Sequence, residues 1–134
     1  MSYKKEMGKR GETVAAEYLE KQGFIVTARN FRVGHDEIDI IAEDEKYIVF
    51  AEVKSRAQTE LNRIYGRPAS AVDYTKKRNL LRAANEYMRI KRPQKQPRID
   101  VIEVYFPPIT ENTPIDIEKL IAVDIRHIRN AVHN

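Results

Sequence analysis

The chain has 134 residues, no cysteine, and 24 lysines and arginines against 20 aspartates and glutamates, so its formal net charge is +4. This length fits a single domain, and the lack of cysteine excludes disulfide bonds and metal sites built on thiolates. No apolar run is long enough to span a membrane, and the N-terminus lacks the apolar core of a signal peptide. We therefore expect one domain over residues 1–134, a cytoplasmic location and no membrane partner.

The first expected element is a helix from Gly8 to Gln22, followed by Gly23 at the position of a left-handed C-terminal cap. Glu12 stands three and seven residues before Ala15 and Leu19, so it lies on the face that should pack against a sheet. An acidic side chain on such a face is unusual. Two interpretations stay open: Glu12 complements the helix dipole near an N-terminus, or it belongs to an acidic site.

Strands are expected next, first at residues 24–29. Two further runs, 37–42 and 47–54, are rich in Ile, Val, Phe and Tyr and are separated only by the polar residues 43–46, which predicts a β-hairpin. Charged residues inside such apolar runs are costly to bury. The hairpin carries three that are notable for this reason: Asp39, Glu52 and Lys54.

The register of the hairpin decides whether these charges meet. Side chains alternate across a strand, so Glu52 and Lys54 share one face. A four-residue turn pairs Asp39 with Phe50 and places Glu52 diagonal to Asp39 on the same face. Two carboxylates so close repel each other, so one must take up a proton, find a cation or share a metal.

An acidic pair beside a lysine has both a chemical and a structural interpretation. Carboxylate oxygens suit a hard cation such as Mg²⁺ or Mn²⁺, and such a metal activates water and steadies the charge on a phosphate during phosphodiester cleavage. Lys54 would orient the nucleophile or offset that charge. Glu12 would add a third carboxylate to the metal site. The structural alternative is a simple ion pair at the frayed end of a hairpin.

Positive charge is concentrated later in the chain. Residues 68–91 combine apolar side chains at helical spacing with many lysines and arginines. Such a helix either follows the phosphate backbone of a nucleic acid or carries its charges on a solvated face. The preceding residues 55–67 form a connection longer than most, which is either a substrate flap or an ordinary loop. The residues that we expect to contact nucleic acid are Arg56, Lys76, Lys77, Arg78 and Arg82.

The last part of the chain predicts a strand at residues 98–106, which stops before two prolines. An edge strand is then expected at residues 119–123 and a terminal helix at residues 124–133. In this interpretation the histidines are solvent-exposed side chains rather than metal ligands. They are His35, His127 and His133.

Several short motifs extend the analysis: Gly8-Lys9-Arg10-Gly11-Glu12, Asn30-Phe31-Arg32, Glu37-Ile38-Asp39-Ile40-Ile41-Ala42, Phe50-Ala51-Glu52-Val53-Lys54-Ser55-Arg56, Tyr65-Gly66-Arg67-Pro68 and Arg98-Ile99-Asp100-Val101. With these motifs the chain resembles the YraN-like family of predicted endonucleases over nearly its whole length. That family is similar to archaeal Holliday junction resolvases and to restriction-endonuclease-like PD-(D/E)xK nucleases. The resemblance implies an α/β fold, in which helices flank a central mixed sheet, and a metal-dependent phosphodiesterase site.

The resemblance also implies roles for single residues. It makes Asp39 and Glu52 ligands of Mg²⁺ or Mn²⁺, Lys54 the catalytic lysine, and Glu12 the acid from the helix that completes the site. The carbonyl oxygen of Val53 would add a backbone ligand. These four side chains are the ones that the residue patterns had already selected.

Three functions stay open at this point. The first is an Mg²⁺-dependent endonuclease that hydrolyses phosphodiester bonds in DNA, including branched or structured DNA. The second is a non-catalytic nucleic-acid-binding module that retains a nuclease-like fold. The third is a scaffold whose acidic hairpin contacts a protein partner. Cleavage of junctions would favour a homodimer, because its two sites would then face opposed strands.

Overall fold

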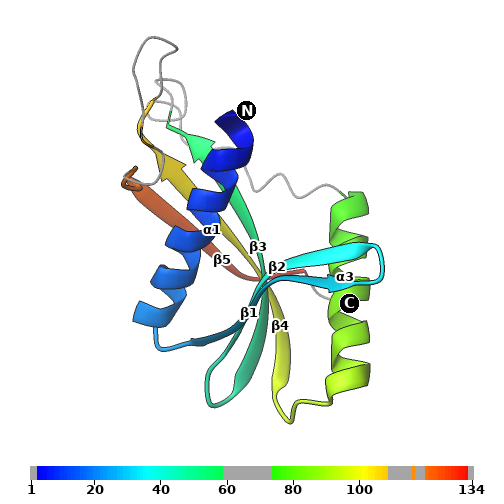
Figure 1. Ribbon diagram of the computed structural model, residues 1–134. Helices are drawn as coiled ribbons and strands as arrows, with labels where there is room; N and C mark the ends of the chain where they lie inside the picture. The colour runs from blue at the N-terminus through cyan, green and yellow to red at the C-terminus, as the bar shows by residue number, and fades with distance from the viewer. Residues whose placement is uncertain (1–2, 59–73, 109–115, 117–119, 133–134) are drawn as a thin grey trace.

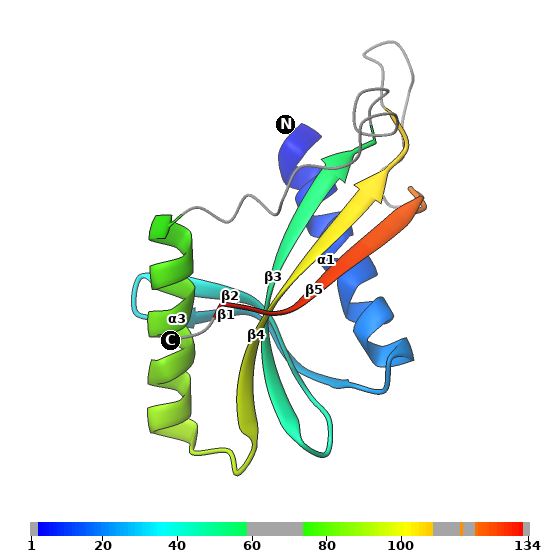
Figure 2. The ribbon, with the colours of Figure 1, turned by 180° about the vertical axis from the view of Figure 1, so that it is seen from behind.

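The computed structural model describes residues 3–58, 74–108, 116 and 120–132. Two helices, α1 (Tyr3–Lys21) and α3 (Tyr74–Lys91), flank one five-stranded sheet with the order β1-β2-β3-β4-β5 (Figures 1 and 2). Strands β3 and β4 pair in parallel and the other neighbours pair antiparallel. The prediction of a mixed α/β sheet between helices is therefore confirmed. The strands are β1 (Ile25–Val33), β2 (Asp36–Glu43), β3 (Tyr47–Ala57), β4 (Gln96–Phe106) and β5 (Asp124–Val132).

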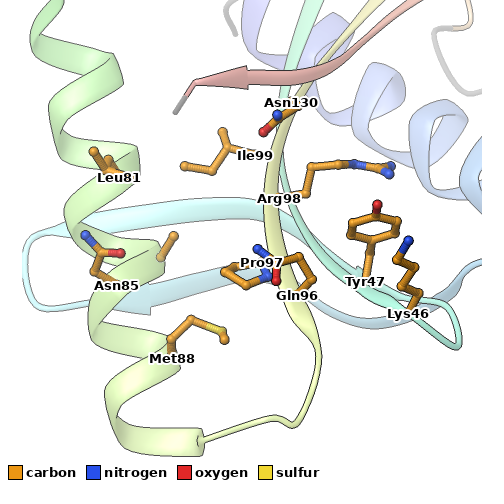
Figure 3. A pocket seen from close by; sticks show the side chains of 11 residues that line it. Lys46, Tyr47, Leu81, Asn85, Met88, Gln96, Pro97, Arg98, Ile99 and Asn130 are labelled. Carbon is orange, nitrogen blue, oxygen red and sulfur yellow. The ribbon is translucent and has the colours of Figure 1, made fainter. Parts of the chain in front are cut away.

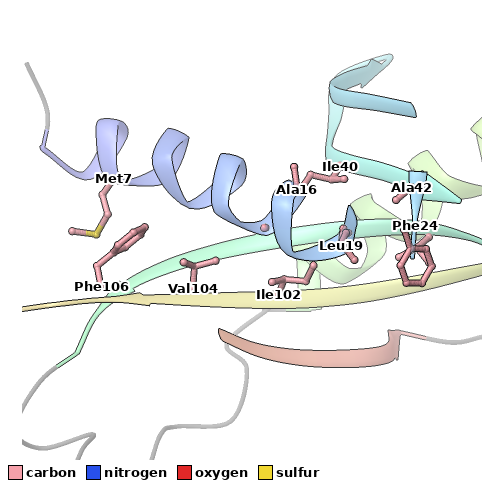
Figure 4. Packing of buried hydrophobic residues seen from close by; sticks show 12 residues of the cluster. Met7, Ala16, Leu19, Phe24, Ile40, Ala42, Ile102, Val104 and Phe106 are labelled. Atoms are coloured by element: carbon pink, nitrogen blue, oxygen red, sulfur yellow. The ribbon is translucent and has the colours of Figure 1, made fainter. Parts of the chain in front are cut away.

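The two helices cover opposite faces of the sheet, because alternate residues of β3 point to different helices. Val49 and Ala51 belong to the buried cluster under α1, which also includes Leu19 of that helix (Figure 4). Ile48 and Phe50 belong to the cluster under α3. This alternation is the period of two that a strand buried on both faces requires. Within the described residues, no helix is long and apolar enough to cross a membrane.

Helix α1 ends as the sequence predicts. Gly23 has a left-handed φ of 96°, and the N–H of Phe24 donates to the carbonyl oxygen of Leu19 at 3.0 Å. The Gly23 N–H donates to the carbonyl of Glu20 at 3.1 Å, which completes a Schellman cap. The helix begins at Tyr3, five residues before the predicted start. Residues 68–73 of the predicted basic helix lie outside the described residues, and the rest of it is α3.

The β2–β3 hairpin is confirmed, but its predicted register is wrong by two residues. Phe50 pairs with Ile41 rather than with Asp39. The turn is tighter than expected: the Asp44 N–H donates to the Tyr47 carbonyl at 3.0 Å, and Asp44 Oδ1 accepts the N–H of Lys46 at 2.8 Å and of Tyr47 at 2.6 Å. A shift of two residues does not by itself turn a side chain to the other face of the sheet.

Residues 124–132 form the strand β5, so the predicted terminal helix is wrong. Ile125 and Ile128 stand three residues apart, a spacing that a helix would also show, but β4 has an open edge whose backbone groups need partners. Strand β5 supplies them by antiparallel pairing with β4. The described part of the predicted edge strand, residues 120–123, is irregular, and His133 lies outside the described residues.

The sheet divides where β2 leaves β3, and we call the space between residues 36–39 of β2 and 52–57 of β3 the fork. Strand β2 pairs with β3 only as far as Ile40↔Ala51, whereas β3 pairs with β4 along its whole length. Beyond that point the β1–β2 hairpin leans toward α3, and β3 continues past α1 (Figure 1). Charged side chains of both strands therefore face a region without strand pairing.

Candidate active site

The fork contains the acidic residues that the sequence singled out. Asp39 stands on β2 at the point of divergence, and Glu52 and Lys54 follow on β3. Because β2 no longer pairs with β3 here, the N–H of Val53 has no β2 carbonyl opposite it. The carboxylate of Asp39 accepts that N–H through Oδ2 at 2.8 Å. The side chain of Asp39 thus ties the two branches of the fork together.

The carboxylates of the fork affect one another electrostatically. Burial and then the negative charges of Glu52 and Glu12 together raise the pKa of Asp39 to about 7, although the hydrogen bond from the Val53 N–H acts to lower it. The Glu52 side chain is only 15% exposed. The structure therefore brings together the three acids that we predicted, from α1, β2 and β3.

Glu12 approaches this group from α1. Its pKa is raised, mainly by burial, while Arg29 and a hydrogen bond with Asn30 work in the opposite direction. Both carboxylates are acceptors, so the Asn30 amide is assigned with its nitrogen toward them, where it donates to Glu12 Oε2 and to Glu37 Oε1, each at 3.1 Å. Sequence reasoning gave neither Asn30 nor Glu37 a role. The sequence signal that could have pointed to Asn30 is its place in the middle of a strand. Asn adopts a left-handed backbone more readily than most residues, so it indicates an irregular strand there.

Two lysines reach Glu52. Lys54 Nζ lies 3.6 Å from Glu52 Oε1, and Lys76 Nζ, from the first turn of α3, lies 3.8 Å from the same oxygen. The pKa of Lys54 is lowered, chiefly by burial and then by contact with Lys76, although Glu52 acts to raise it. Lys54 is 20% exposed and Lys76 is 55% exposed. The predicted lysine is therefore at the acidic site, and a second one joins it.

The donors suit a divalent cation by their chemistry. They are carboxylate oxygens that repel one another, and one of them takes up a proton near neutral pH in place of a cation. In the part of the chain that the structure describes, no three acidic or histidine side chains lie close enough together to form a finished metal-binding set. Closure around an ion would thus require movement of these side chains.

The predicted nucleic-acid contacts are in different environments. Arg56 Nε lies 3.2 Å from the buried carboxylate of Glu103, and Arg82 pairs with Asp36 at 3.0 Å through Nε and 3.1 Å through Nη2. Lys77 and Arg78 are exposed on α3, in the same turn of helix as Lys76. Of these five residues, Lys76 pairs with Glu52, one of the three predicted acids.

A second charged group lies under the other end of α1, and it corrects the prediction for His127. Its side chain is 5% exposed, and Nε2 lies 2.6 Å from Asp100 Oδ2 while Nδ1 lies 2.9 Å from the Tyr18 hydroxyl. Arg98 donates to both oxygens of Asp100 at 2.9 Å. His127 is buried because β5 is a strand, which places it on the same face as Ile125, toward α1. His35 is exposed in the turn between β1 and β2, as predicted.

A cleft of about 700 Å³ lies elsewhere, between α3 and the ends of β3 and β4 near the β2–β3 turn (Figure 3). Its lining includes Lys46, Asn85, Met88 and Gln96, and no carboxylate among the described residues. The cleft therefore offers no carboxylate to a cation, and it is separate from the fork.

Comparison with known proteins gives one consistent result. Residues 11–104 match the model of the uncharacterised protein family UPF0102. A UPF0102 protein of Caldanaerobacter subterraneus subsp. tengcongensis is 40% identical over 129 residues, which cover 96% of this chain and 95% of that protein. UPF0102 proteins of Clostridium kluyveri and Bacteroides thetaiotaomicron are 44% and 39% identical over 106 and 104 residues, which cover 78% of this chain in each case and 84% and 83% of those proteins. The matched range contains all the residues of the fork.

Proposed function

This chain belongs to the uncharacterised protein family UPF0102, and we propose that it is a metal-dependent nuclease that hydrolyses phosphodiester bonds in DNA. Membership confirms the family expected from the sequence. The activity rests on the fork rather than on the family, because none of the relatives named above is described by a function. A restriction-endonuclease-like core is part of the proposal, and the mixed sheet flanked by two helices is compatible with it.

One observation carries the proposal: carboxylates from three elements interact electrostatically beside a lysine, and burial, followed by the charges of Glu52 and Glu12, raises the pKa of Asp39 to about 7. Carboxylates gathered in this way destabilise one another, and folds tolerate such strain most often at functional sites. Glu12, Asp39 and Glu52 would hold Mg²⁺ or Mn²⁺, and the carbonyl oxygen of Val53 would add a ligand. The bound ion would lower the pKa of water and stabilise charge on the phosphate.

The chain's own residues supply the remaining parts of the chemistry. Lys54 Nζ stands beside Glu52, and its lowered pKa means that it gives up its proton more readily than an ordinary lysine. It would orient the attacking water and receive or return a proton at Nζ. Lys76, Lys77 and Arg78 would hold the DNA backbone at the start of α3, and Arg56 would extend that contact along β3. Branched DNA as substrate, a homodimer and a cytoplasmic location stay predictions.

A second candidate function is a nucleic-acid-binding module that keeps the nuclease-like fold without cleavage. The observation in its favour is that Lys54 and Lys76 both neutralise Glu52. With Glu52 engaged in this way, the described residues form no finished metal-binding set. Such a module would still bind DNA through the basic start of α3.

The proposal is tested by gel-resolved cleavage of single-stranded, duplex, flap and four-way-junction DNA, and of RNA, with Mg²⁺, Mn²⁺ or EDTA. We expect metal-dependent product from the wild type and a rate at least about 100-fold lower for Glu52→Gln and for Lys54→Gln. Glu86→Gln is the matched control, because Glu86 pairs with Arg89 on α3 away from the fork. Uncut substrates that the wild type nevertheless shifts in a salt-dependent way would support the binding module instead.

A further inference from the structure

The Asn30-Phe31-Arg32 motif has no part in the proposed reaction so far, although it lies next to the fork. Arg29↔Ile40 and Phe31↔Ile38 are paired between β1 and β2, so Asn30 stands opposite Asp39. The side chain of Asn30 points instead toward α1, where it meets Glu12. Asn30 is therefore a neighbour of two of the three proposed metal ligands.

The backbone of Asn30 explains this direction. Its φ is 51°, in the left-handed region that Asn and Gly adopt most readily. Ala28 and Phe31 both pack against the cluster under α3 although they are three residues apart, which a regular strand does not allow. The alternation of side chains thus changes between them, and the change releases the Asn30 side chain toward the helix that carries Glu12.

The contacts of the amide are selective. Its nitrogen donates to Glu12 Oε2 and Glu37 Oε1, both at 3.1 Å, so one NH₂ group bridges two carboxylates. The amide nitrogen carries two N–H donors, whereas an ionised carboxylate can only accept. The nitrogen of Asn30, and not its oxygen, therefore faces the two carboxylates favourably. Glu37 is also 3.8 Å from Arg32 Nη2. The bridge connects α1 to the β1–β2 hairpin.

Phe31 fixes the other side of the same hairpin. Its ring packs edge to face against Tyr87 of α3, with centroids 5.4 Å apart. The three residues of the motif therefore each fix part of the β1–β2 hairpin. Phe31 holds the hairpin against α3, Arg32 pairs with Glu37, and Asn30 connects the hairpin to Glu12 of α1. A carboxylate on a long, half-buried side chain gains one defined position from such a contact.

We propose that Asn30 is the positioning residue that orients Glu12 toward the cation site of the fork. The inference rests on the proposed function, because it gives Glu12 the role of a metal ligand. Asn30 itself touches neither substrate nor metal in this account. Its role is to hold the Glu12 carboxylate through Oε2 at 3.1 Å, within the electrostatic influence of Asp39 and Glu52.

The test separates the amide from the backbone conformation. Asn30→Gly removes the amide but keeps a residue that accepts a left-handed φ. Asn130→Gly is the matched control: Asn130 is also an Asn with a left-handed φ, 52°, in a strand, and its N–H to Asp100 is retained in Gly. With Mn²⁺ alone as the probe in calorimetry, we expect Asn30→Gly to bind about tenfold more weakly than wild type. The Asn130→Gly variant should bind as the wild type does. Equal Mn²⁺ affinity of wild type and Asn30→Gly would overturn the inference.

A second readout needs no metal. The side-chain amide signals of Asn30, assigned in nuclear magnetic resonance spectra by their loss in Asn30→Gly, should exchange slowly with water and shift clearly in Glu12→Gln. Unchanged signals in Glu12→Gln would refute the contact whatever the metal does. If the wild type binds no Mn²⁺ while these signals still shift, the proposed function fails, and with it the metal-related role of Asn30, but the hydrogen bond stands.

Discussion

Asp39 on β2 and Asp100 on β4 belong to the same sheet, but their surroundings shift their pKa values in opposite directions. Asp39 is half-buried among Glu52 and Glu12, and its pKa rises to about 7, first through burial and then through those charges. Burial acts on Asp100 in the same sense, but hydrogen bonds from His127, Arg98 and the Asn130 N–H outweigh it, so the pKa of Asp100 lies below its ordinary value.

The difference separates a carboxylate with saturated hydrogen bonds from one that we propose to be a metal ligand. Asp100 has a donor for each oxygen, and the network ties β4 to β5 and, through His127 and Tyr18, to α1. A saturated network of this kind holds a fold together. Asp39 receives one backbone N–H and otherwise faces its own kind of charge. This uncompensated charge is the reason that we propose the fork as the cation site.

The largest effect on stability is expected at Asp100. Asp100→Asn leaves the 10% exposed Arg98 side chain without its counter-charge, so the free energy of unfolding should fall by about 3–5 kcal/mol. Chemical denaturation measures it. Because the folded pKa of Asp100 is lowered, its contribution is present above its ordinary value of 3.8 and is lost as the pH falls through the folded pKa. If the free energies of unfolding of the wild type and the variant fell in parallel as the pH is lowered, this stabilising role of Asp100 would be contradicted.

Asp39→Asn should change the free energy of unfolding in the opposite direction and stabilise the protein. The raised pKa means that the protonated form favours folding below the ordinary value of 3.8, and that this contribution is lost as the pH rises through about 7. Without metal, the variant should therefore be more stable than the wild type at neutral pH, by roughly 1.4 kcal/mol for each pKa unit that the fork imposes. The advantage should vanish near pH 4. Urea unfolding in EDTA at several pH values measures it, and a destabilised variant at neutral pH would show that Asp39 is structural like Asp100.

A smaller effect is expected at Gly11, which fits α1 closely against β3 just before Glu12. A Cβ there would overlap Ser55 Oγ and lie 3.1 Å from Ser55 Cβ, so Gly11→Ala should cost about 1–3 kcal/mol and move the Glu12 carboxylate. Gly8→Ala meets nothing within 4 Å and should stabilise the helix by about 0.5–1 kcal/mol. Thermal unfolding of the pair measures both. Equal effects of the two substitutions would mean that the approach of α1 to β3 is not close.

The sequence predicted the elements that local chemistry decides. The helix ending at Gly23, the β2–β3 hairpin and the acids of the fork all follow from periodicity and from charges placed in apolar runs. The register of the hairpin did not, because it depends on Asp44 accepting the N–H groups of Lys46 and Tyr47, and this tightens the turn.

Features that depend on distant partners were missed. Residues 124–132 are a strand because β4 offers an open edge, and His127 is buried because that strand turns it toward Tyr18. Asn30 was visible only as part of a motif, since its role depends on a left-handed backbone beside an irregular part of two strands. In each case the deciding partner lies far away in the chain or on another element.

The central claim is that the fork binds a divalent cation, and calorimetric titration of the metal-free protein with Mn²⁺ near neutral pH tests it most directly. The account predicts one saturable site in the wild type, binding weakened at least about tenfold in Asp39→Asn, and unchanged binding in Asp36→Asn, whose carboxylate pairs with Arg82 instead. The absence of binding by the wild type, or equal binding by Asp39→Asn, would contradict it.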